Sequence, residues 1–331
     1  MVYKALRINE LADGTFSRGI ESMDTSQLPD GELLIRVHYS SLNYKDALSA
    51  TGNKGITKRY PHTPGIDAAG VIEVSSSPLF KVGQSVLVTG YDLGMNCAGG
   101  YGQYIRIPAA WAIEQPSQLT PIDCMTIGTA GITAAIGLHK MELLGLKPSD
   151  GPIVVTGATG GVGSMAICLL NKAGYQTIAI SGKTNAKDYL KSIGAHSIEE
   201  RSWVDDQSGK PLLKPRWAGA IDTVGGNTLA TLLKGCMNEG KVVSTGLVGS
   251  PQLQTTVFPF ILNGISLLGV GSAETPLTVK KEIWKKLSGC WNIQSQLDKI
   301  RVSTDLETLS NKYIPSILAG QITGRVVVSL D

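Results

Sequence analysis

The residues best placed to bind a ligand stand in a glycine-rich run near the middle of the chain. Gly157, Gly160 and Gly163 follow the apolar, β-branched stretch 152–156 and precede a helical pattern that ends at Gly174. A strand, a glycine turn and a helix, in this order, are what a dinucleotide-binding fingerprint requires. The first glycine permits the tight turn, the second lets backbone approach a pyrophosphate, and the third lets the helix pack closely on the strand.

The turn would hold phosphates through its backbone. Gly160, Gly161, Val162 and Gly163 lead into the predicted helix, whose first N–H groups and positive dipole end attract an anion. Any tight strand-to-helix turn can contain glycines, so a purely structural role is the alternative. Both flanks fit the fingerprint and favour a bound dinucleotide.

The end of the next predicted strand indicates which dinucleotide binds. NAD sites place an Asp or Glu there, about 20 residues on, to accept a hydrogen bond from the ribose 2′-OH. Here Ser181, Gly182 and Lys183 occupy that place, and Arg201 follows the third strand. A carboxylate would repel a 2′-phosphate, whereas these groups bind it. We therefore expect NADP(H), the alternative being that Lys183 is a solvated surface lysine.

Two side chains that suit catalysis follow the predicted strand 31–41. Tyr44 can donate to a developing oxyanion or carry a proton, and Asn43 can orient a carbonyl. The segment 43–46 also has the composition of an ordinary turn, so a structural role stays open. The histidines and cysteines lack the spacing of metal ligands. They are His38, His62, His139, His196, Cys97, Cys124, Cys168, Cys236 and Cys290.

Two patterns of secondary structure must position these residues. The first part of the chain has short strands separated by Pro and Gly turns, which predicts a β-rich, barrel-like domain up to about residue 120. These strands are expected at 3–8, 31–41, 71–74, 85–89 and 102–107.

From residue 123 onward, strands alternate with helices, which predicts a parallel, doubly wound α/β domain. Its strands are expected at 152–156, 177–181, 197–198, 220–223, 241–245 and 266–270, the last at the sheet edge. Its helices are expected at 125–141 (interrupted at 128–131), 165–174, 185–193 and 228–236. Helices at 278–287 and 313–318 and a strand at 325–329 follow, and we expect this end to return to the first domain.

Composition excludes several classes of protein. A chain of 331 residues with 42% apolar and 17% charged residues suggests about two folded domains. The net charge of +3 comes without a long basic run, so nucleic-acid binding is not indicated. The first ten residues lack the apolar core of a signal peptide, and we expect no membrane-spanning stretch. The scattered cysteines suggest a reducing cytoplasm.

Seven stretches together match one known family. They are SSLNYKDAL at 40–48, YPHTPGIDAAG at 60–70, IGTAGITA at 127–134, VTGATGGVGS at 155–164, DTVGG at 222–226, TTVFPFILNGISLLGVGS at 255–272 and GRVVV at 324–328. Over nearly its whole length the chain resembles a medium-chain dehydrogenase/reductase. Within that superfamily it resembles the zinc-independent acryloyl-CoA reductases and quinone oxidoreductases of the YhdH/YhfP type.

The departures from the zinc-dependent relatives concern their metal ligands. Those enzymes carry Gly-His-Glu where this chain has Gly65, Ile66 and Asp67. The position of their zinc-binding cysteine is held by Asn43, and that of their third ligand by Thr129. The resemblance therefore implies that no zinc is bound, so that an activated alkene or a quinone suits the site better than an ordinary ketone.

The resemblance also implies an architecture and a site. A GroES-like β-rich catalytic domain would span 1–123 and 271–331, and a Rossmann NADP-binding domain 124–270. Tyr44 would contact the nicotinamide end of the cofactor, and Leu247, Ile261 and Ser272 would line the rest of that channel. Members of this family are homodimers, which implies that the stretch 258–270 pairs with its copy through the edge strand of the Rossmann domain.

The expected activity is hydride transfer from NADPH to the β-carbon of an α,β-unsaturated acyl thioester such as acryloyl-CoA. Tyr44 or Asn43 would stabilise the enolate. The alternatives are an NADPH:quinone oxidoreductase and a non-catalytic NADPH-binding sensor.

Overall fold

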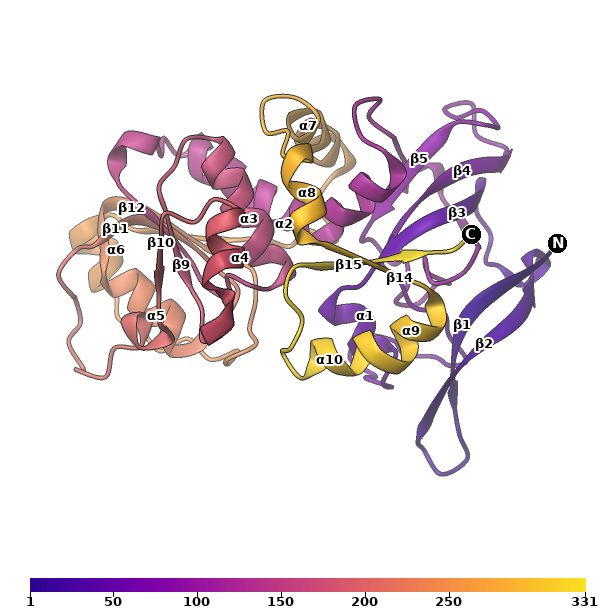
Figure 1. Ribbon diagram of the computed structural model, residues 1–331, viewed down its shortest axis with the longest axis horizontal. Coiled ribbons are helices and arrows are strands. Elements are labelled where there is room, and N and C mark those ends of the chain that lie inside the picture. The colour runs from indigo at the N-terminus through magenta and orange to yellow at the C-terminus, as the bar shows by residue number, and fades with distance from the viewer. The chain divides into compact units, whose positions relative to one another are not determined.

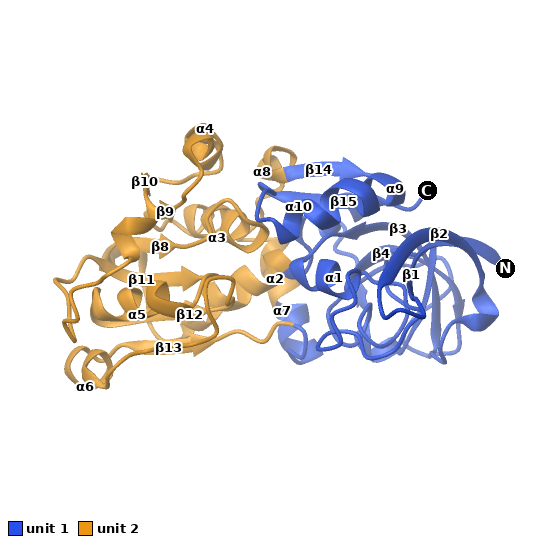
Figure 2. Ribbon diagram, turned by 90° about the horizontal axis from the view of Figure 1, so that it is seen from below, with its two compact units in different colours: residues 1–129, 273–282, 301–331 blue, residues 130–272, 283–300 orange.

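The computed structural model describes residues 1–331, which form two compact units (Figure 2). Unit 1 comprises Met1–Thr129, Ala273–Glu282 and Arg301–Asp331, and unit 2 comprises Ala130–Ser272 and Ile283–Ile300. The chain passes from one unit to the other at 129/130, 272/273, 282/283 and 300/301. The sequence suggests domain boundaries at 123/124 and 270/271. Residues 283–300 belong to unit 2, although the sequence suggests the first domain for them.

A seven-stranded sheet forms the centre of unit 1, in the order β14-β15-β3-β4-β5-β7 with β6 paired to β3 (Figure 1). All its pairs are antiparallel except β14–β15. Its strands are β3 (Leu33–Ser41), β4 (Asp67–Ser75), β5 (Ser85–Thr89), β6 (Tyr104–Ile107), β7 (Ile113–Glu114), β14 (Arg301–Thr304) and β15 (Arg325–Ser329). The expected early strands are confirmed. The return of the chain's end is confirmed too, because β15 pairs with β3.

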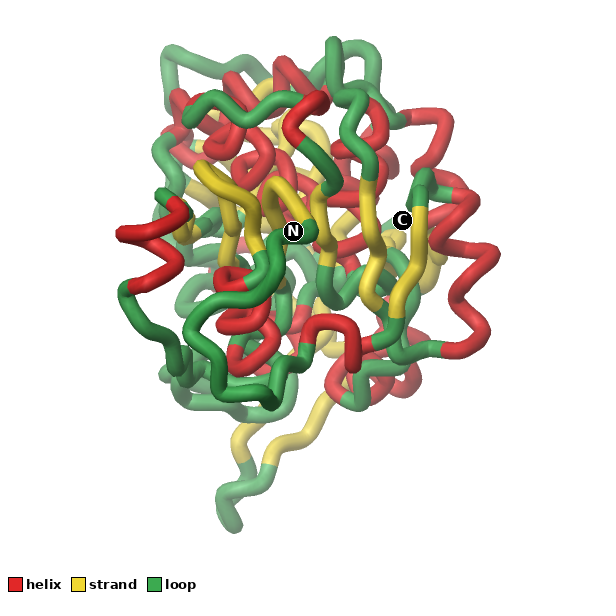
Figure 3. Tube along the Cα trace, turned by 90° about the vertical axis from the view of Figure 1, so that its left-hand side faces the viewer, coloured by secondary structure: helices red, strands yellow, loops and turns green.

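A hairpin and short helices complete unit 1. Strands β1 (Val2–Glu10) and β2 (Phe16–Asp24) pair along their full length and are joined by a short loop (Figure 3). The helices are α1 (Tyr44–Ser49), α9 (Leu306–Thr308) and α10 (Ile314–Leu318). Alternate residues of β3, such as Leu33, Ile35 and Val37, enter one apolar core with Val86 of β5 and Val326 of β15.

Unit 2 is built on a six-stranded parallel sheet in the order β10-β9-β8-β11-β12-β13. Its strands are β8 (Ile153–Val155), β9 (Thr177–Ile180), β10 (Ser197–Glu199), β11 (Trp217–Asp222), β12 (Cys236–Ser244) and β13 (Ser266–Gly269). Numbered along the chain from β8, the strands follow the order 3-2-1-4-5-6 of a Rossmann fold. The order of the strands reverses between β8 and β11, which is the switch point of the sheet. The predicted doubly wound domain is confirmed, with β13 at the edge.

Five α-helices lie wholly within unit 2: α3 (Gly161–Lys172), α4 (Lys187–Ser192), α5 (Gly226–Lys234), α6 (Phe258–Asn263) and α8 (Gln294–Ile300). The apolar segment 258–263 is therefore helical, and only 266–269 of the stretch expected to pair at the edge is a strand. Helix α7 (Leu277–Leu287) matches its expected range.

Helix α2 (Pro121–Leu143) is continuous in sequence but interrupted at Gly128, whose φ of 47° and ψ of −159° are not helical. The predicted interruption is confirmed. By length and mean hydropathy this helix alone would be able to cross a membrane, and 83% of its apolar window is buried inside the protein. The expectation that no stretch has such a composition is therefore wrong. A buried core helix has the same composition as a membrane span.

Candidate active site

The glycine turn after β8 has the geometry that its sequence indicates. Gly157 has a positive φ of 55°, and a Cβ at Gly163 would lie 2.3 Å from the carbonyl oxygen of Gly157. Only glycine therefore allows α3 to pack this closely on the turn. Gly160 precedes the helix, and Gly161 and Val162 in its first turn are half-buried. Their N–H groups have no partner within the helix and suit a phosphate.

A buried carboxylate beside the turn fixes its shape, and the sequence did not assign Asp222 this role. Thr156 Oγ1 donates to Asp222 Oδ1 at 2.6 Å, and the N–H of Gly225 donates to Oδ2 at 2.7 Å. Burial raises the pKa of Asp222, and these hydrogen bonds oppose that rise. The bonds join the ends of β8 and β11 at the switch point of the sheet, where dinucleotides bind in Rossmann folds.

The residues expected at the 2′-phosphate line one open groove of about 1370 Å³ in unit 2. Ser181, Gly182 and Lys183 follow β9, and Arg201 begins a short turn after β10. Arg201 lies against Gly182, at which a Cβ would come within 2.6 Å of Arg201 Nε. The pKa of Lys183 is lowered by burial and by the charge of Arg201. Two neighbouring cations in a groove favour an anion between them.

The residues expected along the nicotinamide channel lie in different surroundings within unit 2. Leu247 is 64% exposed and lines a second cavity of about 300 Å³, together with Gly225 and Val270. Ser272 accepts a hydrogen bond of 2.7 Å from Thr133. Ile261, 69% exposed on α6, lines neither cavity.

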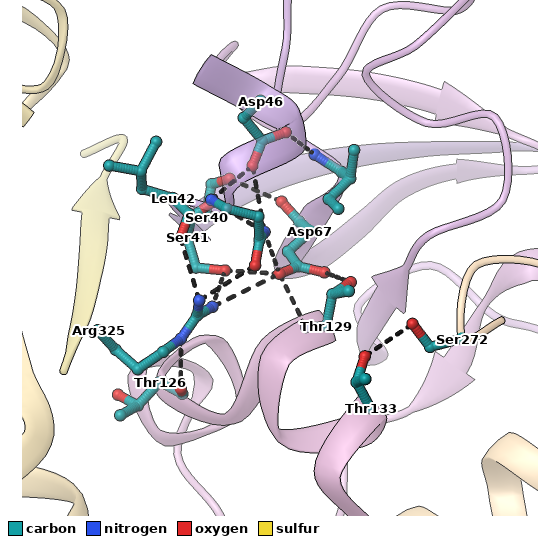
Figure 4. Close-up of polar contacts among 12 residues, drawn as sticks. Ser40, Ser41, Leu42, Asp46, Asp67, Thr126, Thr129, Thr133, Ser272 and Arg325 are labelled. Atoms are coloured by element: carbon teal, nitrogen blue, oxygen red, sulfur yellow. Dashed lines mark hydrogen bonds and ion pairs between the residues drawn. The ribbon is translucent and has the colours of Figure 1, made fainter. Parts of the chain in front are cut away.

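In unit 1, the carboxylate of Asp67 gathers a buried polar cluster (Figure 4). Asp67 Oδ2 accepts hydrogen bonds from Ser41 Oγ at 2.6 Å, Asn43 Nδ2 at 2.8 Å and the N–H of Thr129 at 2.9 Å. Its Oδ1 accepts from Thr129 Oγ1 at 2.5 Å, and Arg325 Nη2 lies 3.7 Å from Oδ2. We call these five residues the Asp67 cluster.

The two candidate catalytic residues differ in how far this cluster engages them. The amide of Asn43 also donates to Asp46 Oδ2 at 3.1 Å, and its Oδ1 accepts from Arg325 at 3.0 Å. Both ends of the Asn43 amide are therefore occupied within the protein, which leaves it little capacity to orient a substrate carbonyl. Tyr44, the first residue of α1, is 44% exposed.

Asp46 is the nearest acid to Tyr44 in sequence, and the sequence did not assign it a role. It is fully buried and accepts hydrogen bonds from the N–H groups of Asn43 and Ile66, each at 2.8 Å. Burial, helped by the charge of Asp67, raises its pKa to about 7. Asp46 caps the start of α1 and joins it to the loop before β4.

The positions of the zinc ligands in the zinc-dependent relatives are occupied by this hydrogen-bonded cluster. Asn43 and Thr129 both donate to Asp67, and Ile66 offers no ligand atom in its side chain. No group of three or more His, Cys, Asp or Glu side chains in residues 1–331 is arranged to hold a metal ion. The donor set at these positions, amide, hydroxyl and alkyl, does not fit zinc.

Two family models match the chain. The model described as "Alcohol dehydrogenase GroES-like domain" matches residues 29–117, and "Zinc-binding dehydrogenase" matches residues 161–288. The first lies within unit 1, and the second covers most of the Rossmann-type sheet.

Named relatives match over the whole chain. The chain is 41% identical over 322 residues to "Probable acrylyl-CoA reductase AcuI" of Escherichia coli, covering 97% of this chain and 98% of the relative. It is 40% identical over 329 residues to "Putative quinone oxidoreductase YhfP" of Bacillus subtilis, covering 99% of both.

Solved structures share the fold over the same length. The yhdH oxidoreductase of Salmonella enterica, crystallised in complex with NADP, has a TM-score of 0.95 at 41% identity and covers 99% of this chain and 100% of its own. The Bacillus subtilis yhfP crystal structure, with NAD bound, has a TM-score of 0.96 at 40% identity and covers 100% of both chains.

Proposed function

Because the chain belongs to the medium-chain dehydrogenase/reductase superfamily, in its branch of YhdH/YhfP-type acryloyl-CoA and quinone oxidoreductases, we propose that it is an NADPH-dependent enoyl thioester reductase. Its substrate would be an activated C=C such as that of acryloyl-CoA, reduced without zinc. The observation that carries the proposal is the pair of cations, Lys183 and Arg201, in a groove at the end of β9 where NAD sites have an acid.

The residues of unit 2 would bind and orient the cofactor. The N–H groups from Gly160 to Gly163 would hold the pyrophosphate, and Ser181, Lys183 and Arg201 the 2′-phosphate. Bound NADPH supplies a hydride, with its electron pair, to the β-carbon of the thioester. The hydrogen bonds of Asp222 keep the adjacent turn in shape, which fixes the cofactor relative to the sheet.

Tyr44 is our candidate for contact with the substrate. Hydride addition at Cβ leaves an enolate, whose oxygen the exposed phenol can stabilise by donating a hydrogen bond. A proton from Tyr44 or from water then adds to Cα and completes the saturated thioester. The negative charge is delocalised onto an oxygen, so this reaction needs less polarisation than the reduction of a ketone.

Steady-state kinetics with NADPH and acryloyl-CoA, run beside simple quinones, test the proposal. We expect acryloyl-CoA reduction in wild type, and its loss in Tyr44→Phe with quinone reduction retained. Tyr39→Phe, which alters another tyrosine of unit 1, is the control and should retain both activities. Turnover of acryloyl-CoA no faster than in an enzyme-free blank would refute the proposed substrate class.

The rival activity is NADPH:quinone oxidoreduction, which the name of the YhfP relative favours. The Tyr44→Phe variant separates the two, because a quinone accepts hydride without needing a proton donor for a carbon atom. If wild type reduces quinones and no enoyl thioester, the quinone activity is the function to retain.

We also propose a homodimer in the cytoplasm. Strand β13 has a neighbour on one side only. In the preceding helix α6, Ile261 and Leu262 are 58–69% exposed, and so is the N-cap residue Val257. An unpaired edge strand flanked by exposed apolar side chains suits pairing with a second copy. The five cysteines are free thiols, as expected in a reducing compartment.

A further inference from the structure

Arg325, the first residue of β15, carries a guanidinium that is almost completely buried, with 3% of the residue exposed. Four hydrogen bonds and one ion pair occupy it. Nε donates to Thr126 O at 3.0 Å, Nη1 to Leu42 O and to Asn43 Oδ1, both at 3.0 Å, and Nη2 to Ser41 Oγ at 2.8 Å. Nη2 also lies 3.7 Å from Asp67 Oδ2.

This set of partners is what a buried cation requires. A charge without partners in a protein interior is strongly disfavoured, and one that is paired and fully hydrogen-bonded is tolerated. Ser41 Oγ accepts from Arg325 and donates to Asp67, so the cation and the carboxylate share a neighbour as well as an ion pair. Arg325 and Asp67 therefore depend on each other to remain buried as charges.

The backbone of α2 is shaped around this pair. A Cβ on Gly128 would lie 2.6 Å from Asp67 Oδ2, 2.8 Å from Arg325 Nη2 and 2.8 Å from Ser41 Oγ. Gly128 is also the position where α2 leaves helical geometry. The interruption lets Thr126 O and the Thr129 N–H turn toward the two charges.

The contacts of Arg325 converge on the residues directly before Tyr44. Three of its hydrogen bonds reach Ser41, Leu42 and Asn43, which lie 282 to 284 positions earlier in the chain. Leu42 N also donates to Val326 O at 2.9 Å. Because Asn43 is the N-cap of α1, the place of Asn43 sets where the helix begins and where Tyr44 projects.

We propose that Arg325 is a positioning residue of the reductase: together with Asp67 it fixes Asn43, and through this N-cap it aims the exposed phenol of Tyr44. The inference rests on the proposed function for the role of Tyr44. The structural part, that Arg325 sets the conformation of Tyr44, can be tested without any substrate.

The test compares Arg325→Lys and Arg325→Met with a matched control. Arg301→Met removes another arginine of unit 1, which pairs with Asp123 at 3.2 Å and donates to Thr126 Oγ1 at 3.3 Å. All chains are labelled with 3-fluorotyrosine, and the Tyr44 resonance is assigned by its loss in Tyr44→Phe. We expect Arg325→Met to shift or broaden this resonance, Arg325→Lys to do so less, and Arg301→Met to leave it unchanged.

Kinetics supply the second readout. A misplacement of about 1 Å at a reacting group can cost about 100-fold in rate, so we expect kcat with acryloyl-CoA to fall by that order in Arg325→Met. The Kd for NADPH, measured by fluorescence, should stay within about twofold, because the groups that would hold its phosphates lie in unit 2 and are untouched by the substitution. In the double variant with Tyr44→Phe, kcat should fall no further than in the more impaired single variant.

An unchanged Tyr44 resonance in both Arg325 variants would overturn the proposal, as would losses in kcat that multiply in the double variant. If Arg325→Met does not fold, Arg325→Lys decides, because it keeps a buried cation while losing the forked contacts. If wild type shows no enoyl reduction, the proposed function fails, but the fluorine spectra still decide whether Arg325 positions Tyr44.

Discussion

Replacing Arg201 by alanine should convert an enzyme that prefers NADPH into one that distinguishes poorly between NADPH and NADH. The guanidinium lies against Gly182 and lines the groove with Lys183. In the proposed complex it donates to the 2′-phosphate, which NADH lacks. A hydrogen bond to a charged partner contributes about 1.5–3 kcal/mol. Since 1.4 kcal/mol is tenfold, we expect kcat/KM for NADPH to fall by about 10- to 100-fold.

The neighbouring lysine limits the size of this loss. The charge of Arg201 lowers the pKa of Lys183, after burial, so removing Arg201 moves that pKa back up. Lys183 then remains protonated and retains its share of the phosphate binding, which keeps the expected effect short of a complete loss.

The assay measures kcat/KM for NADPH and NADH at a fixed saturating concentration of the electrophile, in wild type and Arg201→Ala. Lys191→Ala is the matched control, since it removes one exposed positive charge from α4 outside the groove. We expect kcat/KM for both nucleotides in Lys191→Ala, and kcat/KM for NADH in Arg201→Ala, to stay within about twofold of wild type. Equal losses with both nucleotides, or an unchanged NADPH constant, would refute the reasoning.

Three further changes test other parts of the structure. Gly128→Ala should lower the free energy of unfolding by about 2–4 kcal/mol in urea titrations, because φ is 47° at this position and the added Cβ would meet the Asp67 cluster. Gly145→Ala is the control: the space around Gly145 is open, so its free energy of unfolding should fall by only about 1 kcal/mol. Asp46→Asn should flatten the pH dependence of the free energy of unfolding. The pKa of Asp46 is about 7 in the native protein and near 4 in the unfolded chain, so wild type loses up to about 4 kcal/mol of unfolding free energy as the pH rises through this window. Identical pH slopes in wild type and Asp46→Asn would contradict this. Ile261→Asp on α6 should shift the proposed dimer toward monomer in light scattering, with unchanged circular dichroism.

Much of the fold follows from local pattern, and unit 2 shows why. The run 152–156 is apolar and β-branched because β8 is buried in the middle of the sheet, and the glycines after it are required by a positive φ and a close helix. Strand β2 gave no such signal. Its nine residues are half-buried or exposed, and it pairs only with β1, so no alternation of apolar and polar residues marks it.

The helix α6 and the strand β14 were missed for different reasons. The sequence Phe258–Asn263 is apolar up to its last residue and carries a proline at its second position, so its composition alone fits a strand or a short helix equally well. Strand β14 is only four residues long and polar, and it exists because β15 offers it a parallel partner. Its pairing is set by tertiary structure, which a local pattern does not contain.

The site divides in the same way between local and distant determinants. Ser181, Lys183 and Arg201 could be predicted to lie near one another, and they do line one groove, because they stand at fixed offsets from strands that the pattern predicts. Arg325 and Asp67 lie far apart in the chain, and no spacing rule relates them. A weaker signal was present: each charge adjoins an apolar run, at 326–328 and 68–69, and a charge beside a buried strand needs a partner.

The Asp67 cluster also narrows the choice between the two catalytic candidates. Asn43 uses its amide N–H groups on Asp67 and Asp46 and its oxygen on Arg325, so a substrate carbonyl would have to displace a bond inside a buried network. Such a displacement leaves a buried charge or amide without its partner, which costs about 1–3 kcal/mol or more. Tyr44 follows Asn43 by one residue and exposes its side chain at the same helix start. The fold thus holds Asn43 rigid and presents Tyr44, and we expect the chemistry at this end of the site to depend on the phenol.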